Sequence, residues 1–265
     1  MAANTGRWLY PKPSANIDDY ADPAQREPFV FDDGKTKSLY FSLDQLQSRM
    51  NKNQPDALEV DYTKTMMAFL LLTRTPRRLA MIGLGGGSLV RFCHRHLPGS
   101  HMTVAEINAS VIALRDEFMV PPDSERLRVL LADGADFVRG LHDALDVLLV
   151  DGFDHDGQSA QLCSQRFYDD CHRALDAKGV LVVNLHHDHP EHALYMSRIQ
   201  QSFGVGVFEL ASKEKSNSVV FACKTANVSL EQFRARASLD DFSEGLRQQL
   251  KPEFDRLAWL IQKTR

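Results

Sequence analysis

An acidic cluster follows an apolar run near the middle of the chain, with the sequence DGFDHDG at residues 151–157. Carboxylates that gather at one point repel each other unless a cation or strong hydrogen-bond donors compensate them. A substrate that carries amino groups would supply that compensation. We therefore expect this cluster to bind a basic ligand, and the plain alternative is an acidic surface loop.

A glycine-rich segment, GLGGGS at residues 83–88, lies between an apolar run and a helical stretch. Glycines let the backbone approach a ligand closely, and the start of the next helix offers unpaired N–H groups. Contacts to such a ligand would come from Gly83, Gly85 and Gly87. The segment could equally be a tight turn, and its G-x-G-x-G spacing differs from the G-x-G-x-x-G of dinucleotide-binding loops.

Two further polar residues end apolar runs. Glu106 ends VAE, where an acid could accept both hydroxyls of a ribose. Asp133 and Gly134 end the next run, where the aspartate could accept from an adenine amino group and the glycine would let the base lie flat. A solvated glutamate and an ordinary Asp-Gly turn are the alternatives. Together with the glycine-rich segment they indicate an adenosine-containing ligand. NAD is one such ligand, and these residues do not exclude it.

These residues need a scaffold that brings the ends of several strands together. Continuous apolar runs alternate with helical stretches, which is typical of a doubly wound, mostly parallel sheet with ligands beyond the carboxyl ends of its strands. The predicted helices cover residues 89–96, 109–118 and 164–179, and Gly179 is expected to end the last of them. The predicted strands are 79–84, 101–108, 126–134, 145–153, 179–185 and 218–224.

The remaining segments predict smaller units at either end. Residues 29–31 and 38–41 flank Asp33-Gly34, a strong hairpin signal, and residues 62–72 have the pattern of a buried helix. A capping box at residues 229–232 indicates a helical tail. We expect an N-terminal arm and β-hairpin domain at 1–60, a Rossmann-like domain at 61–228 and a helical tail at 229–265.

The composition excludes several classes of protein. The 265 residues are 43% hydrophobic and 25% charged, as in a globular chain that can bury a sizeable core. The net charge is −4, so the chain lacks the excess of basic residues expected of a protein that binds nucleic acid or an anionic membrane. The four cysteines show no C-x-x-C spacing, and neither a signal peptide nor a membrane span is evident. We expect a soluble, cytoplasmic enzyme.

Several segments of the chain resemble those of a known family. The segments MIGLGGGSL, VAEIN, ADGADFV, DVLLVDGFDHDG and QLCSQRFYDDCHRAL are similar to those of the polyamine aminopropyltransferases, that is, spermidine synthase and its relatives. The resemblance covers residues 38–223. It implies a Rossmann-like, S-adenosylmethionine-dependent methyltransferase fold with a small N-terminal β domain. It also implies a homodimer, a small-molecule amine acceptor and decarboxylated S-adenosylmethionine as donor, without a metal.

The resemblance also assigns roles to particular residues. On the donor side, Glu106 would hold the ribose, Asp133 the adenine amino group, and Gln47 would be a further donor contact. On the acceptor side, Asp151 would accept the proton of the attacking amine and Asp154 would pair with the amine substrate.

Tyr62 would line the acceptor pocket, and residues 156–164 would form a loop that closes over the site.

Two departures from the family pattern keep other functions open. The family usually places an aspartate in the glycine loop against the donor's ammonium group, and here that position is Gly86. The residue after Tyr62 is Thr63, where the family usually has His or Gln. The GLGGGSL form also resembles the spermidine-synthase-like domain of certain protein N-methyltransferases. An S-adenosylmethionine-dependent N-methyltransferase and a non-catalytic nucleoside- or polyamine-binding protein are therefore the alternative hypotheses.

A histidine-rich run, HHDHPEH at residues 186–192, contains residue types that bind zinc or nickel. It follows a predicted strand, and the sequence indicates no second group of ligands nearby. We interpret the run as a polar loop and expect no metal site.

Overall fold

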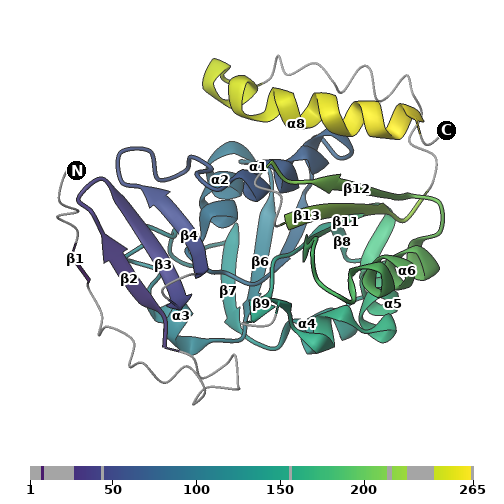
Figure 1. Ribbon diagram of the computed structural model, residues 1–265, viewed down its shortest axis with the longest axis horizontal. Coiled ribbons are helices and arrows are strands. Elements are labelled where there is room, and N and C mark those ends of the chain that lie inside the picture. Colours follow the sequence, from purple (N-terminus) through teal and green to yellow (C-terminus); the bar gives the residue numbers. More distant parts are fainter. Residues whose placement is uncertain are drawn as a thin grey trace.

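A seven-stranded sheet runs through the molecule, with the strand order β12-β13-β11-β8-β5-β6-β7 (Figure 1). The structure is a computed structural model that describes residues 7–8, 27–42, 45–154, 157–213, 217–225 and 242–263. Strands β5 to β8 and β11 are parallel, whereas β13 is antiparallel to β11 and β12 is antiparallel to β13. The strands are β5 (Arg78–Ile82), β6 (His101–Glu106), β7 (Leu127–Leu131), β8 (Leu145–Val150), β11 (Leu175–His186), β12 (Val207–Ala211) and β13 (Asn217–Cys223).

This topology confirms the expected doubly wound α/β fold and its predicted strands. Each parallel strand is an apolar run because both of its faces are buried. In β8, Val147 and Leu149 contribute to one core while Leu148 and Val150 contribute to the other. The sequence patterns do not predict β12, whose residues VFELA mix a charge into a short edge strand.

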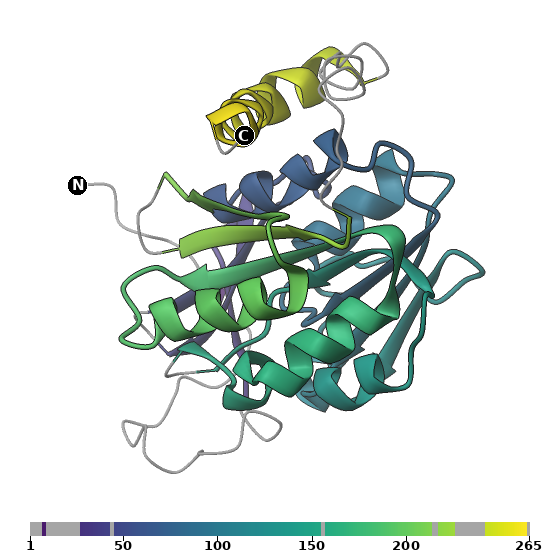
Figure 2. The same ribbon diagram turned by 90° about the vertical axis from the view of Figure 1, so that its right-hand side faces the viewer.

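Helices cover both faces of the sheet (Figures 1 and 2). One face carries α1 (Asp61–Met66), η3 (Met67–Leu71), α2 (Ser88–His96), α3 (Ala109–Ala113) and α8 (Glu244–Lys263). The other face carries α4 (Gly134–Arg139), η4 (Ala160–Cys163), α5 (Gln165–Ala174) and α6 (His192–Phe203). The buried helix expected over residues 62–72 is present as α1 and η3.

A four-stranded antiparallel sheet of β1 (Arg7–Trp8), β2 (Phe29–Asp32), β3 (Thr36–Ser42) and β4 (Gln45–Asn51) lies beside the main sheet (Figure 1). The predicted hairpin is confirmed: Asp33 Oδ1 accepts hydrogen bonds from the backbone N–H groups of Lys35 and Thr36 in its turn. Val30 and Met50 join the core beneath the main sheet, which fixes the small sheet against it. Strand β4, which the sequence patterns do not predict, reaches the glycine loop.

Two predicted helix ends are wrong. The helix over residues 164–179 ends at Ala174, and β11 begins at Leu175. Leu175 adopts extended dihedral angles (φ −75°, ψ 144°), so it belongs to the strand and does not continue the helix. Gly179 lies inside β11, where the pairing with β8 shifts register between Leu175 and Val180. The helix expected over 109–118 is also shorter, because α3 ends at Ala113.

The C-terminal helix α8 packs across the face formed by α1 and η3 and buries Leu246 and Leu250 there. A buried carboxylate anchors it: Glu253 accepts a hydrogen bond from Thr65 Oγ1 at 3.1 Å and pairs with Arg256. The capping box at 229–232 lies outside the described residues. Among the helices described, none combines the length and apolar character that crossing a membrane requires.

Candidate active site

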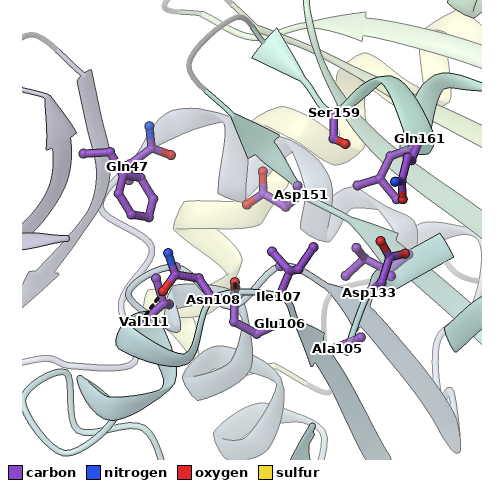
Figure 3. A pocket seen from close by; sticks show the side chains of 17 residues that line it. Gln47, Ala105, Glu106, Ile107, Asn108, Val111, Asp133, Asp151, Ser159 and Gln161 are labelled. Atoms are coloured by element: carbon purple, nitrogen blue, oxygen red, sulfur yellow. Dashed lines mark hydrogen bonds between the residues drawn. The ribbon is translucent and has the colours of Figure 1, made fainter. Parts of the chain in front are cut away.

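A pocket opens at the carboxyl edge of the main sheet, where four neighbouring strands end (Figure 3). Gly83 follows β5, Glu106 ends β6, Asp133 lies just after β7, and Asp151 follows β8. The parallel arrangement brings these residues to one edge, as the sequence predicts. Predicted site residues that line the pocket are Gln47, Gly83, Gly85, Glu106, Asp133, Gly134 and Asp151.

Gly83 directly follows β5 and lies beside Asp151, the residue after β8. Its φ is +89°, in the region that favours glycine. A Cβ atom at this position would lie 2.3 Å from the carbonyl oxygen of Asp151. The neighbouring backbone is fixed on both sides, because Gly83 N donates to Ala105 O and Asp151 N donates to Ile82 O, each at 2.9 Å. Glycine at 83 therefore lets the backbone at Asp151, just after β8, approach the glycine loop.

Glu106 holds the glycine loop in place. Its Oε2 accepts a hydrogen bond from Leu84 N at 2.7 Å and its Oε1 accepts one from Asn108 N at 2.8 Å. Burial raises the pKa of Glu106, and the backbone N–H donors oppose that rise. The backbone N–H groups of Gly85 and Ile107 also favour the charged form, so the carboxylate faces backbone donors from both sides at the wall of the pocket.

Asp133 uses one oxygen as a helix cap. Its Oδ1 accepts hydrogen bonds from the backbone N–H groups of Ala135 at 2.7 Å and Asp136 at 3.1 Å, which begin α4. Because the cap occupies Oδ1, Oδ2 is the oxygen that could accept from a ligand in the pocket. The side chain thus has a fixed orientation before any ligand binds.

Asp151 lies at the centre of a hydrogen-bond network. Its Oδ2 accepts from the Tyr62 hydroxyl at 3.0 Å, and its Oδ1 accepts from Asn184 Nδ2 at 2.9 Å. Asn184 Oδ1 in turn accepts from Asn217 Nδ2 at 3.0 Å. Burial raises the pKa of Asp151, while the two hydrogen bonds act in the opposite direction. A carboxylate with a raised pKa, held by two donors, is suited to accept a proton.

Sequence reasoning missed Asn184 and Asn217. Asn184 lies near the carboxyl end of β11, so the rule that selected the other strand-end residues could have found it. Asn217 begins β13 and is paired with His186 in the sheet register. Both residues act on the site through Asp151, so we regard them as positioning residues.

The remaining predicted residues are placed differently. Gly87 is the N-cap residue of α2, and a Cβ atom there would meet Val120 and Arg91 instead of the pocket. Asp154 belongs to the short strand β9 (Phe153–Asp154), which pairs with β10 (Gly157–Gln158), but its side chain lies outside the described residues. Of the closing loop expected over residues 156–164, Ser159, Gln161 and Leu162 line the pocket, and residue 156 is not among the described residues.

The packing around Gly86 explains why this position carries no aspartate. A Cβ atom on Gly86 would lie 2.6 Å from Ser48 Oγ and 3.1 Å from a ring carbon of Phe118. Ser48 is buried on β4, and its hydroxyl lies 3.1 Å from that of Ser88 at the start of α2. The loop and β4 therefore pack together so closely that a side chain at 86 has no space.

We predict that Gly86→Ala destabilises the protein by about 1–3 kcal/mol, because the added methyl group overpacks this contact. Ser48→Gly in the same chain should recover part of that loss, so the two changes will be non-additive in a double-mutant cycle. Urea unfolding of the four proteins measures the coupling. Gly99→Ala is the matched control, since a Cβ atom there meets nothing within 4 Å. Additive effects at positions 48 and 86 would contradict the prediction.

We also predict that Asn184→Leu moves the acidic limb of the kcat/KM profile to higher pH. The hydrogen bond from Asn184 lowers the pKa of Asp151, so removing it raises that pKa further and the base form appears only at higher pH. Asn217→Ala removes only the hydrogen bond from Asn217 to Asn184, so it should shift the limb less, in the same direction. A limb that stays in place, or moves to lower pH, would show that Asp151 is not the titrating base.

Together, the sheet order and the pocket at its carboxyl edge define a Rossmann-like enzyme of the S-adenosylmethionine-dependent methyltransferase fold. The family model described as "Spermine/spermidine synthase domain" matches residues 59–216. The chain belongs to this family, and its activity is of the spermidine synthase-like, aminopropyltransferase kind. A polyamine aminopropyltransferase of Chromobacterium violaceum is 34% identical over 223 residues, which cover 84% of this chain and 85% of that protein.

Two solved structures share the fold. A probable spermidine synthase from Corynebacterium glutamicum superposes with a TM-score of 0.64 at 19% identity, covering 87% of this chain and 82% of that one. Human methyltransferase-like protein 13, in complex with SAH, gives a TM-score of 0.59 at 21% identity, covering 76% of this chain and 93% of that one. At these identities the similarity concerns the fold alone.

Proposed function

We propose that the enzyme transfers an aminopropyl group from decarboxylated S-adenosylmethionine to a small diamine of the putrescine type. The observation that carries the proposal is Asp151, a half-buried carboxylate with a raised pKa at the same pocket edge as Glu106 and Asp133. In this assignment Glu106 binds the ribose hydroxyls, Asp133 Oδ2 binds the adenine amino group, and the backbone from Gly83 to Gly85 lies against the nucleoside.

The chemistry requires a base beside the acceptor. An alkyl ammonium group has a pKa of about 10.4, judged by lysine, so at neutral pH the nucleophile must lose a proton. Asp151 accepts that proton, and Tyr62 and Asn184 hold the carboxylate in position. The amine nitrogen then bonds to the carbon next to the sulfonium, the carbon–sulfur bond breaks, and methylthioadenosine leaves. Asp154 is proposed to pair with the second amino group of the acceptor.

The charge of the pocket supports a decarboxylated donor. Among the described residues that line it there are three carboxylates, those of Glu106, Asp133 and Asp151, and no lysine, arginine or histidine. S-Adenosylmethionine would place its own carboxylate in these surroundings without a basic side chain to pair with it. The decarboxylated donor carries only its sulfonium and ammonium charges, which the carboxylates of the pocket attract.

N-Methyl transfer is a second candidate, and the packing of Gly86 against Ser48 favours it. That packing leaves no room for the acid that the family usually offers to the ammonium group of a decarboxylated donor. Attack on the methyl carbon of the same sulfonium would then yield S-adenosylhomocysteine.

One experiment tests the proposal. The purified enzyme is incubated with 1,4-diaminobutane and either donor, and the nucleoside product is identified by mass spectrometry. Methylthioadenosine together with an aminopropylated amine is the expected result. S-Adenosylhomocysteine with a methylated amine would instead establish methyl transfer. Donor binding without turnover of any amine tested would indicate a binding protein and overturn both.

A further inference from the structure

Two histidines of the run at residues 186–192 and a glutamate from the later strand β12 meet at the edge of the sheet. His187 follows β11, His192 is the first residue of α6, and Glu209 lies on the edge strand β12 (Figure 1). One ligand-type atom from each of the three residues lies within 4.8 Å of the other two. None of the three side chains has a role in the transferase chemistry proposed above.

Their geometry is close to that of a metal site. Glu209 Oε1 lies 2.9 Å from His192 Nε2 and 3.7 Å from His187 Nδ1. Neighbouring ligands of a tetrahedral zinc ion, with bonds of about 2.0–2.1 Å, lie about 3.3 Å apart, which falls between these two distances. Small side-chain rotations would therefore place the three atoms around one ion.

The polar groups here are also incompletely satisfied. Glu209 Oε1 is shielded from solvent, and no described residue donates a hydrogen bond of good geometry to it. His192 Nε2 lies 3.2 Å from Ser218 Oγ, which can donate to it. The ring nitrogen has one lone pair, so an ion bound at Nε2 would take the place of the serine hydroxyl, beside Glu209 Oε1. A buried acceptor without a donor is costly, and a cation placed between the two would remove that cost.

We propose that His187, His192 and Glu209 bind a divalent transition-metal ion, and that zinc fits the site best. Two imidazoles and one carboxylate form a ligand set that zinc commonly takes, with a fourth position left for water. The His187 side chain is 49% exposed, so the ion has a path from solvent and a side open to water. The bound ion would connect the end of β11, the start of α6 and strand β12.

The histidine-rich run alone does not predict this site, because the third ligand comes from β12. The run at 186–192 supplies only the two imidazoles. Glu209 reaches them because β12 pairs with β13 in a register that sets Glu209 opposite Val220, two residues from Ser218.

Zinc binding to the untagged, chelator-treated enzyme provides the test. Titration with zinc chloride, followed by calorimetry, should show one site per chain. Glu209→Gln and His192→Asn should each weaken that site by at least about 100-fold. His142→Asn is the matched control: His142 Nδ1 also lies 2.9 Å from a carboxylate oxygen, that of Asp143, but among the described residues no third ligand joins this pair. The control should bind zinc as the wild type does.

Cobalt provides a second measurement that uses only the folded wild type and the control. A tetrahedral site of nitrogen and oxygen ligands should give visible absorption bands on addition of cobalt, and zinc should displace them. Zinc should also raise the unfolding temperature of both proteins. Zinc affinity that is unchanged in Glu209→Gln, or an octahedral cobalt spectrum, would overturn the proposal. None of these readouts depends on transferase activity, so the proposed function can fail separately.

Discussion

Replacing Asp151 by asparagine should lower kcat by about 10²–10⁴-fold and leave the dissociation constant of the donor nearly unchanged. The expected factor is that of a positioned general base. An asparagine keeps the shape of the side chain: its oxygen can accept from Asn184, and its amide can donate to the Tyr62 hydroxyl. Steady-state kinetics and calorimetric titration of the donor measure the two effects separately.

The same substitution should not destabilise the fold. Because burial raises the pKa of Asp151, its charged form is less favourable in the folded state than in the unfolded chain. The stability that Asp151 contributes is present at low pH and is lost as pH rises, so Asp151→Asn should unfold at the same or a higher temperature at neutral pH. Asp136→Asn, on the exposed surface of α4, is the control and should alter neither property. Retained activity in Asp151→Asn would remove its catalytic role.

Replacing Gly83 by alanine should destabilise the protein by about 3 kcal/mol or more and abolish donor binding. Two effects combine: a positive φ that costs a side-chain-bearing residue about 1–3 kcal/mol, and a Cβ atom 2.3 Å from the carbonyl oxygen of Asp151. Relief of that contact must move the end of β8, which carries Asp151.

Gly34 in the hairpin offers a matched control for this prediction. Its φ is also +89°, but a Cβ atom there meets nothing within 4 Å. Gly34→Ala should therefore show the dihedral cost alone and leave donor binding intact. Urea unfolding and donor titration of both variants provide the comparison. Equal destabilisation of the two proteins would show that the contact with Asp151 is unimportant.

How far the sequence predicts the fold depends on how each strand is buried. Strands β5 and β8 are apolar on both faces, so they appear as continuous runs and are predicted correctly. Strand β4, with the sequence QLQSRMN, mixes buried and exposed residues and contains no apolar run, and β12 is a short edge strand with a central glutamate. Both are stabilised by pairing with neighbours, which a local pattern does not show. The end of α5 at Ala174 likewise depends on pairing of Leu175 with β8.

The site residues likewise differ in how well the sequence predicts them. Glu106, Asp133 and Asp151 are predictable because each is an acid directly after an apolar run, and parallel strands bring such positions to one edge. Asn184 obeys the same rule, but an amide inside a strand carries no obvious chemical signal until its contact with Asp151 is seen. The packing of Ser48 against Gly86 joins residues 38 positions apart, and only the folded structure reveals it.

That contact also restricts how this enzyme could evolve. Restoring an acid at position 86 would first produce a poorly folded intermediate, unless residue 48 had already become smaller. The order of the two replacements therefore matters, and descendants of this sequence are expected to keep both residues or to change both. Where homologous chains carry an aspartate at the position of Gly86, we expect a glycine, or a strand shifted away from the loop, at the position of Ser48.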